Sequence, residues 1–162
     1  MRGHAYAERT DWWDYVASLP SPRVLVIEDA DREPGRGAFL GEIHAHILQA
    51  LGCVGGITNG AVRDLPAVSE TGFQLFGGGL ALSHAYTHII DFGAPVAVGG
   101  LHVKSGDLLH GDVHGILSIP PEIASQIPGV VEQIRDHERH LIALCQSADF
   151  SIEKLRAAVA SA

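Results

Sequence analysis

Residues 41–64 read GEIHAHILQALGCVGGITNGAVRD, and this stretch decides the fold. Its first half has apolar residues at the three- and four-residue intervals of one helical face: Ile43, Ile47, Leu48 and Leu51. That spacing predicts an amphipathic helix, which Gly52 ends. Residues 54–58 then read as a short buried strand, and Asn59-Gly60 predicts a turn because both residues tolerate positive φ.

Arg63 and Asp64 therefore emerge just beyond the end of a strand. The start of the helix, at Gly41 and Glu42, presents unpaired backbone N–H groups and would lie beside the turn in a βαβ-like arrangement. Together these parts predict a corner of the fold that binds anions and can hold a metal ion.

The flanking sequence continues the alternation. Upstream, residues 3–8 are expected to form an edge strand and residues 10–19 an amphipathic helix, and the run VLVI at 24–27 reads as a strand buried on both faces. Downstream we expect the following elements: a helix at 66–70, a strand at 74–76, strands within 85–90, 96–98, 101–103, 108–109 and 115–119, and helices at 130–145 and 151–159. The chain thus reads as one α/β domain over residues 1–162.

Composition limits the function. The 162 residues are 46% apolar, with a formal net charge of −8 and a mean hydropathy of +0.16, values typical of a globular protein. No apolar run is long enough to cross a membrane, and the acidic balance disfavours nucleic-acid or anionic-membrane partners. We expect a cytoplasmic protein. Cys53 and Cys145 are expected to be reduced and buried.

Three ordered motifs carry a family likeness: GCVGGITNGAVRD, GGLHVKSGD and GDVHGILSIP. Together they resemble the RraA-like family, which includes divalent-metal-dependent pyruvate aldolases and a regulator of ribonuclease E. The resemblance implies a swivelling β/β/α domain with a compact β-sheet or barrel core over residues 22–125 and flanking helices at 126–162. It also implies a homotrimer or a dimer of trimers with active sites between subunits.

The aldolases of that family have an acidic residue, twenty intervening positions and then Arg-Asp. Glu42, followed by Arg63-Asp64, fits this spacing, with Glu where Asp is common. Several features depart from the family pattern. Ala67 stands where an acidic residue is usual, and Asn59 stands where Asp often precedes Gly. The stretches SHAYTHIIDFG and HGDVHG add histidines, and by comparison with the family we expect the chain to begin late. A carboxylate from the C-terminal region of a neighbouring subunit can complete the family's site, and Glu138 is a candidate for it here.

The side chains suit this chemistry. Asp64 and Glu42 offer the oxygen ligands that Mg²⁺ or Mn²⁺ prefers, and Arg63 would hold a substrate carboxylate or a developing negative charge. The backbone N–H groups at the helix start are a second candidate for substrate binding: Gly41, Glu42, Ile43 and His44. The alternative for Arg63 and Asp64 is a structural ion pair at a turn.

The ten histidines include three close pairs, His44 with His46, His84 with His88, and His110 with His114. A zinc site built from them is one alternative. A place in the substrate pocket or at a subunit interface is another, and ordinary polar residues are a third.

The leading prediction is a Mg²⁺- or Mn²⁺-dependent lyase that cleaves a 4-hydroxy-2-oxo acid to pyruvate, with oxaloacetate decarboxylation as a related reaction. Its catalytic residues would be Arg63, Asp64 and Glu42. The alternative from a different class is a non-catalytic regulator that binds an RNA-degrading enzyme.

Overall fold

The computed structural model describes residues 10–160, and the backbone contacts divide the chain into two compact units, Met1–Ser118 and Ile119–Ala162. The strand expected at residues 3–8 lies outside the described residues. Each unit is described by itself, and the expectation of a single domain over the whole chain stays a prediction.

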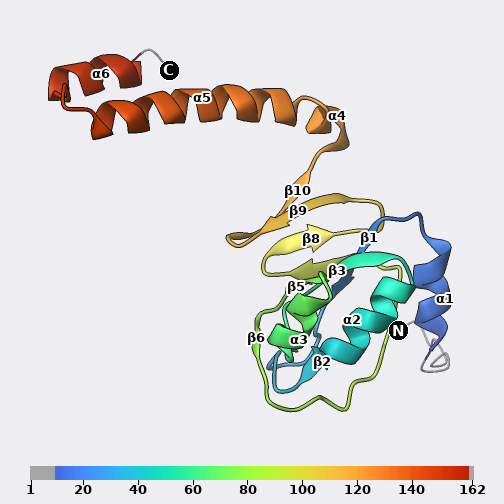
Figure 1. Cartoon of the computed structure of the whole chain (residues 1–162). Coiled ribbons are helices and arrows are strands. Elements are labelled where there is room, and N and C mark those ends of the chain that lie inside the picture. The colour runs from blue at the N-terminus through green and yellow to red at the C-terminus, as the bar shows by residue number, and fades with distance from the viewer. Residues whose placement is uncertain (1–9, 161–162) are drawn as a thin grey trace. The chain divides into compact units, whose positions relative to one another are not determined.

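The first unit repeats one pattern, in which two short strands are followed by a helix (Figure 1). After helix α1 (Asp11–Ser18), the first repeat is β1 (Arg23–Ile27), β2 (Ala38–Leu40) and α2 (Glu42–Ala50). The second is β3 (Cys53–Thr58), β4 (Ala61–Val62) and α3 (Leu65–Glu70). The third has only its strands, β5 (Gln74–Phe76) and β6 (Gly79–Leu80).

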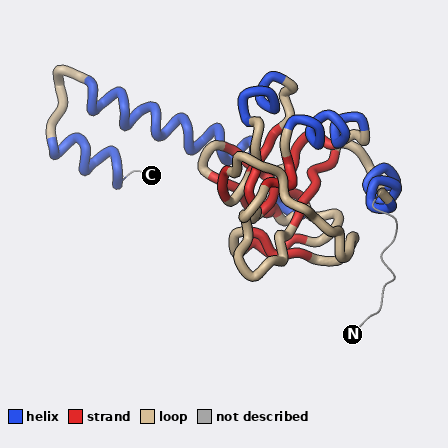
Figure 2. The backbone as a smooth tube through the Cα atoms, turned by 90° about the horizontal axis from the view of Figure 1, so that it is seen from below, coloured by secondary structure: helices blue, strands red, loops and turns tan. Residues whose placement is uncertain are grey.

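The first strand of each repeat joins one parallel sheet, in the order β1-β3-β5, and the second strand joins another, in the order β2-β4-β6. Each repeat therefore adds one strand to each of the two sheets. Helices α2 and α3 pack side by side and lie on the same side of these strands (Figure 2). This arrangement confirms the expected α/β class.

The predicted turn at Asn59-Gly60 is where the chain passes from β3 in one sheet to β4 in the other. The Asn59 side chain ties this turn to the loop after β1. Its Oδ1 accepts a hydrogen bond from the backbone N–H of Asp29 at 2.7 Å, and its Nδ2 donates to the Asp29 carbonyl at 3.0 Å. A carboxylate could not donate the second bond, so the Asn that departs from the family pattern has a structural role here.

Beyond β6 the first unit forms two smaller strand pairs: β7 (Val96–Val98) with β8 (Leu101–Val103), and β9 (Leu108–Asp112) with β10 (Gly115–Ile119). The strand expected at 85–90 is wrong. Residues 85–90 form no strand, and the nearest β-bridge joins the preceding residue, His84, to Ala38 of β2. Because β2 ends at Leu40 and the chain turns into α2, no strand partner is left for the residues that follow.

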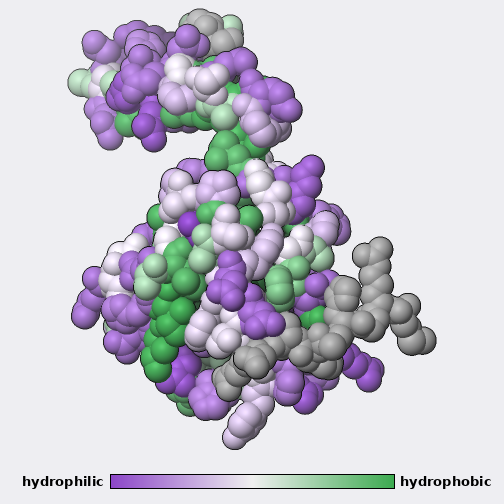
Figure 3. All heavy atoms as spheres, turned by 90° about the vertical axis from the view of Figure 1, so that its right-hand side faces the viewer, coloured by the Kyte–Doolittle hydropathy of each residue, from purple (hydrophilic) through white to green (hydrophobic). Residues whose placement is uncertain are grey.

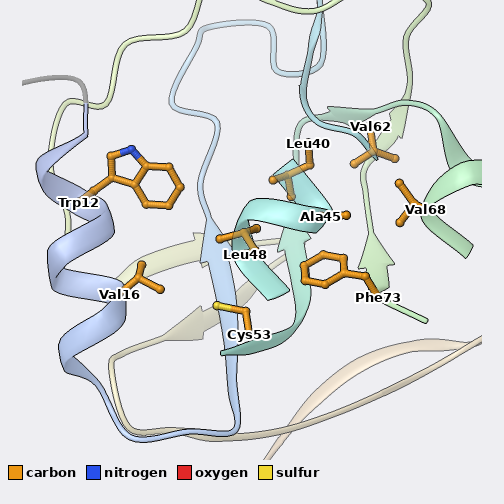
Figure 4. Close-up of a cluster of buried hydrophobic side chains, with 9 residues drawn as sticks. All are labelled: Trp12, Val16, Leu40, Ala45, Leu48, Cys53, Val62, Val68 and Phe73. Atoms are coloured by element: carbon orange, nitrogen blue, oxygen red, sulfur yellow. The ribbon is translucent and has the colours of Figure 1, made fainter. Parts of the chain in front are cut away.

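The hydrophobic core lies among α1, α2, α3 and the strands next to them (Figure 4). Leu48 of α2 has no exposed surface, and Leu40 and Val68 are 1% and 2% exposed. Ala45 and Leu48, three residues apart, form the buried face of α2.

Three burial predictions are wrong. Val54, the first residue of the strand predicted to be buried at 54–58, is 50% exposed. Ile43 is 74% exposed, because it lies about 200° around the helix from the buried Ala45. The strand β1 is an edge strand of its sheet, so Val24 is 40% exposed instead of buried on both faces.

The two cysteines are free and differ in exposure: Cys53 is buried, whereas Cys145 is exposed, contrary to prediction. Burial raises the pKa of the Cys53 thiol, and the nearby Arg23 opposes that rise in part.

The second unit contains α4 (Pro121–Ala124), α5 (Ile127–Gln146) and α6 (Ile152–Ala160), with α6 folded back on α5. The helices expected at 130–145 and 151–159 are confirmed, and α5 begins three residues earlier than predicted. Ser151 acts as the expected N-cap, since its Oγ accepts a hydrogen bond from the backbone N–H of Lys154 at 3.2 Å. No helix within the described residues is long and apolar enough to span a membrane.

Candidate functional site

The β/β/α repeat brings the predicted site residues together. Gly41 and Glu42 follow the end of β2, and Arg63 and Asp64 follow the end of β4, its parallel neighbour in the same sheet. The backbone N–H of Arg63 donates to the Leu40 carbonyl at 3.1 Å, which holds the two strand ends in register. The twenty residues between Glu42 and Arg63 therefore hold the rest of α2 and the strands β3 and β4, which return the chain to the same edge of the sheet.

Asp64 is held in an unusual conformation. It has φ 57° and ψ 31°, the left-handed region, and it is the one non-glycine residue with positive φ in the described part of the chain. Asp64 is also the N-cap residue of α3, but its side chain makes no capping hydrogen bond. Asp is among the residues that most often cap helices, so its carboxylate has been turned away from its usual local partner.

The Asp64 carboxylate points instead at the start of α2. Its Oδ2 accepts a hydrogen bond from Arg63 Nε at 3.0 Å and lies 3.4 Å from the backbone nitrogen of Glu42. The side chains of Arg63 and Asp64 are 34% and 33% exposed, so solvent and small ligands reach both. Within the described residues, Asp64 Oδ1 and the two terminal nitrogens of Arg63 make no hydrogen bond.

The predicted anion site at the start of α2 needs one correction. The N–H of Glu42 already faces a carboxylate, that of Asp64, which occupies the positive end of this helix. The His44 ring packs on Phe39, with ring centroids 4.5 Å apart. A substrate carboxylate would therefore meet Arg63 more readily than the Glu42 N–H.

Gly41 allows this close approach. A Cβ atom at Gly41 would stand 2.7 Å from Asp64 Oδ2 and 2.9 Å from Arg63 Cγ, closer than carbon atoms normally come to such groups. The backbone of Gly41 is extended, with φ −160°, so any residue can adopt it. Glycine is required here because the Arg63 and Asp64 side chains leave no room for a Cβ atom.

We expect Gly41→Ala to lower any activity of this site by tenfold or more, because the added methyl group displaces Asp64 and Arg63. The matched control is Gly79→Ala, since a Cβ at Gly79 meets no heavy atom within 4 Å. Steady-state rates of the two variants, with circular dichroism to check folding, make the comparison. Equal activity in both variants would contradict this role for Gly41.

The carboxylates suit a hard divalent cation in composition. Mg²⁺ is often held by one or two carboxylates and keeps several waters, and here Asp64 has a free oxygen while the Glu42 side chain is exposed. Among the described residues, no group of three or more His, Cys, Asp or Glu side chains is arranged to hold a metal ion. A metal at this site would therefore take its other ligands from water or from groups other than the described residues of this chain.

Among the described residues, the pairs His84/His88 and His110/His114 make no hydrogen bond to Arg63, Asp64 or Glu42. His84 Nδ1 lies 3.3 Å from the Ala85 carbonyl, and the His84 ring meets Tyr86 edge-on. His114 Nδ1 lies 3.3 Å from Asp112 Oδ1, and the backbone N–H of His114 donates to the same oxygen at 2.8 Å. The hydrogen bonds from His114 lower the pKa of the Asp112 carboxyl.

A cavity of about 960 Å³ lies elsewhere in the first unit, lined by residues of β3, β5, β8 and β9. Its walls are mainly apolar, and Asp112 is the only charged residue among the described residues that line it. Neither Arg63 nor Asp64 contributes to it. Sequence patterns did not predict this cavity, because its walls come from strands far apart in the chain.

The fold and this site define an α/β protein of the swivelling β/β/α class. The RraA-like family (Aldolase/RraA) matches residues 6–118, and the chain belongs to that family. The match covers the first unit, which holds the candidate site.

Individual relatives agree with this assignment. A protein of Halalkalibacterium halodurans, named provisionally as a 4-hydroxy-4-methyl-2-oxoglutarate aldolase, is 31% identical over 101 residues, 62% of this chain and 48% of the relative. The chain spans less than half the length of the curated relatives it matches.

Two solved structures share the fold. A protein of Pseudomonas syringae pv. tomato has a TM-score of 0.69 and 25% identity, over 88% of this chain and 71% of that one. Streptomyces coelicolor RraAS2, described as an unusual member of the RNase ES inhibitor RraA protein family, has a TM-score of 0.60 and 26% identity, over 87% and 70% of the two chains. The family thus includes both provisionally named aldolases and RraA proteins.

Proposed function

We propose that this protein is a divalent-metal-dependent lyase that cleaves a 4-hydroxy-2-oxo acid to pyruvate. The observation that carries the proposal is the conformation of Asp64, which is left-handed, does not cap its own helix and is turned to Arg63 and Glu42. Such strain concentrates at functional sites. The similarity to the provisionally named aldolase supports the choice of substrate class.

Each residue has a proposed role. Arg63 binds the substrate carboxylate, or the charge that develops on the C2 oxygen, through its two free terminal nitrogens. Asp64 and Glu42 would hold Mg²⁺ or Mn²⁺, which acts as a Lewis acid on the 2-oxo group. Glu42 would also orient the water that accepts the proton of the C4 hydroxyl.

The reaction that these groups support is a retro-aldol cleavage. The C4 hydroxyl loses its proton, the C3–C4 bond breaks, and the electron pair passes to the C2 oxygen. C3 then takes up a proton and becomes the methyl group of pyruvate. Oxaloacetate decarboxylation would use the same site, because it also leaves an electron pair on C3 that the C2 oxygen accepts.

The test is pyruvate release from 4-hydroxy-4-methyl-2-oxoglutarate and from oxaloacetate, with Mg²⁺, with Mn²⁺ and with EDTA. We expect metal-dependent turnover that falls at least about a hundredfold in Asp64→Asn. Glu70→Gln, which removes an exposed carboxylate from the same helix as the cap position, is the matched control and should retain full activity. Turnover that survives both EDTA and Asp64→Asn would overturn the proposal.

A second candidate function is a non-catalytic regulator that binds an RNA-degrading enzyme, and the similarity to RraAS2 favours it. Under this proposal the folded protein would release no pyruvate but would lower the cleavage rate of a ribonuclease E-type enzyme. Asp64→Asn would leave that inhibition unchanged. For either function, the assembly we propose is a homotrimer or a dimer of trimers in the cytoplasm.

A further inference from the structure

The second unit has no core of its own. No described residue between Ile119 and Ala160 is buried, although helix α5 has a strongly amphipathic sequence. Two helices folded on each other rarely bury enough apolar surface to be stable in water. Figure 3 shows hydrophobic residues gathered along one edge of this unit, with hydrophilic residues over the rest of the face drawn. The unit therefore needs a partner surface.

Helix α6 covers only part of the apolar side of α5. His137, Leu141 and Leu144, which share one face at intervals of four and three residues, are half-buried in the hairpin. By contrast, Ile134 and Ile142 are 50% and 55% exposed. The side of α5 next to the α6 contact is thus left open.

One stripe of residues along α5 is complementary to itself when a second copy of the helix runs antiparallel to it. At intervals of four, three and four residues, its members are Val131, Arg135, Glu138 and Ile142. The stripe has an apolar residue at each end and one charge of each sign between them. If a second copy of α5 lay antiparallel to the first, Val131 of each copy would face Ile142 of the other, and Arg135 of each copy would face Glu138 of the other. The two-fold symmetry would therefore give two Arg–Glu pairs.

The two central charges are available for such pairing. Within the described residues, neither Arg135 nor Glu138 forms an ion pair, whereas Arg139 and Asp136 are paired with each other. The stripe thus has the half-buried Val131 at one end, the exposed Ile142 at the other, and an Arg and a Glu without ion-pair partners between them. These two charges are complementary to the same stripe on an antiparallel copy.

We propose that α5 pairs with α5 of a second copy of this chain in an antiparallel, two-fold symmetric contact along Val131, Arg135, Glu138 and Ile142. The apolar ends of the stripe supply buried surface, and the two Arg–Glu pairs set the register. This contact covers Ile142 and adds buried apolar surface to a unit in which no described residue is buried.

The experiment is sedimentation velocity on the full chain over a range of concentrations. Arg135→Glu places two glutamates opposite two glutamates, and Glu138→Arg places two arginines opposite two arginines. Each single variant should therefore raise the dissociation constant by at least about tenfold, so that the mass falls twofold at a concentration where the wild type is paired. Arg156→Glu, a charge reversal at an exposed position of α6 outside the stripe, should keep the wild-type mass.

Sedimentation of a mixture of the two single variants distinguishes a direct charge contact from a general loss of helix stability. The mixture should recover the paired mass, because each mutant helix then faces the opposite charge, and the double variant Arg135→Glu/Glu138→Arg should pair by itself. An effect on helix stability alone would not be rescued by mixing. The proposal is overturned if the wild-type mass is unchanged by both single variants, as expected if the open side packs on the first unit of its own chain or on a different protein.

Discussion

Replacing Asp64 by glycine is expected to abolish the proposed lyase activity while leaving the stability of the protein within about 1 kcal/mol of wild type. Glycine relieves the left-handed backbone at this position, which costs an ordinary residue about 1–2 kcal/mol. The lost pair with Arg63 is partly exposed, and such pairs contribute about 0–1 kcal/mol. The greater freedom of glycine in the unfolded chain offsets part of the gain.

Asp64→Ala separates the two roles of this residue. Alanine lacks the carboxylate and keeps the backbone strain, so it should unfold about 1 kcal/mol more easily than Asp64→Gly. Urea denaturation measures that difference, and the pyruvate assay should find both variants at least about a hundredfold below wild type. If alanine is as stable as glycine here, Asp64 is not strained. If either variant keeps its activity, the carboxylate is not part of the site.

Leu48→Ala is expected to destabilise the first unit by about 3 kcal/mol, within the range of about 2–5 kcal/mol measured for buried leucines. Leu48 has no exposed surface and lies in the cluster between α1 and the sheets, so its truncation leaves a cavity that neighbours cannot fill easily (Figure 4). The melting temperature should fall by roughly 10 °C.

Ile43→Ala, on the same helix, is the matched control. Ile43 is 74% exposed, so its truncation should change the free energy of unfolding by less than about 0.5 kcal/mol. Thermal unfolding of both variants checks the burial directly. A larger loss for Ile43→Ala than for Leu48→Ala would mean that α2 is rotated about its axis relative to the arrangement described.

The sequence predicted which candidate residues lie close together better than it predicted the core face of α2. Glu42 and Arg63-Asp64 were identified from a spacing, and the structure explains that spacing by the rest of α2 and the strands β3 and β4, which return the chain to the same edge of the sheet. The core face of α2 was predicted in part, since Leu48 is buried as expected but Ile43 is not. Apolar spacing defines a helical face only to within about a quarter turn, and tertiary contacts choose its centre.

Two features of the site could not be predicted. The left-handed conformation of Asp64 has no sequence signal, because a non-glycine residue takes it up only when its neighbours impose it. The need for glycine at position 41 depends on side chains that are more than twenty residues away in the chain. Both arise from the approach of two strand ends.

The amino-acid sequence by itself determined the α/β class, the helices α2, α5 and α6, the turn at Asn59-Gly60 and the membership of the family, because local propensity and ordered motifs are properties of short stretches. Only the tertiary structure decided that the strands alternate between two sheets, that 85–90 forms no strand, and that the Asp64 carboxylate faces the start of α2. These features depend on which strand ends meet in space, and that is set by packing across the whole unit.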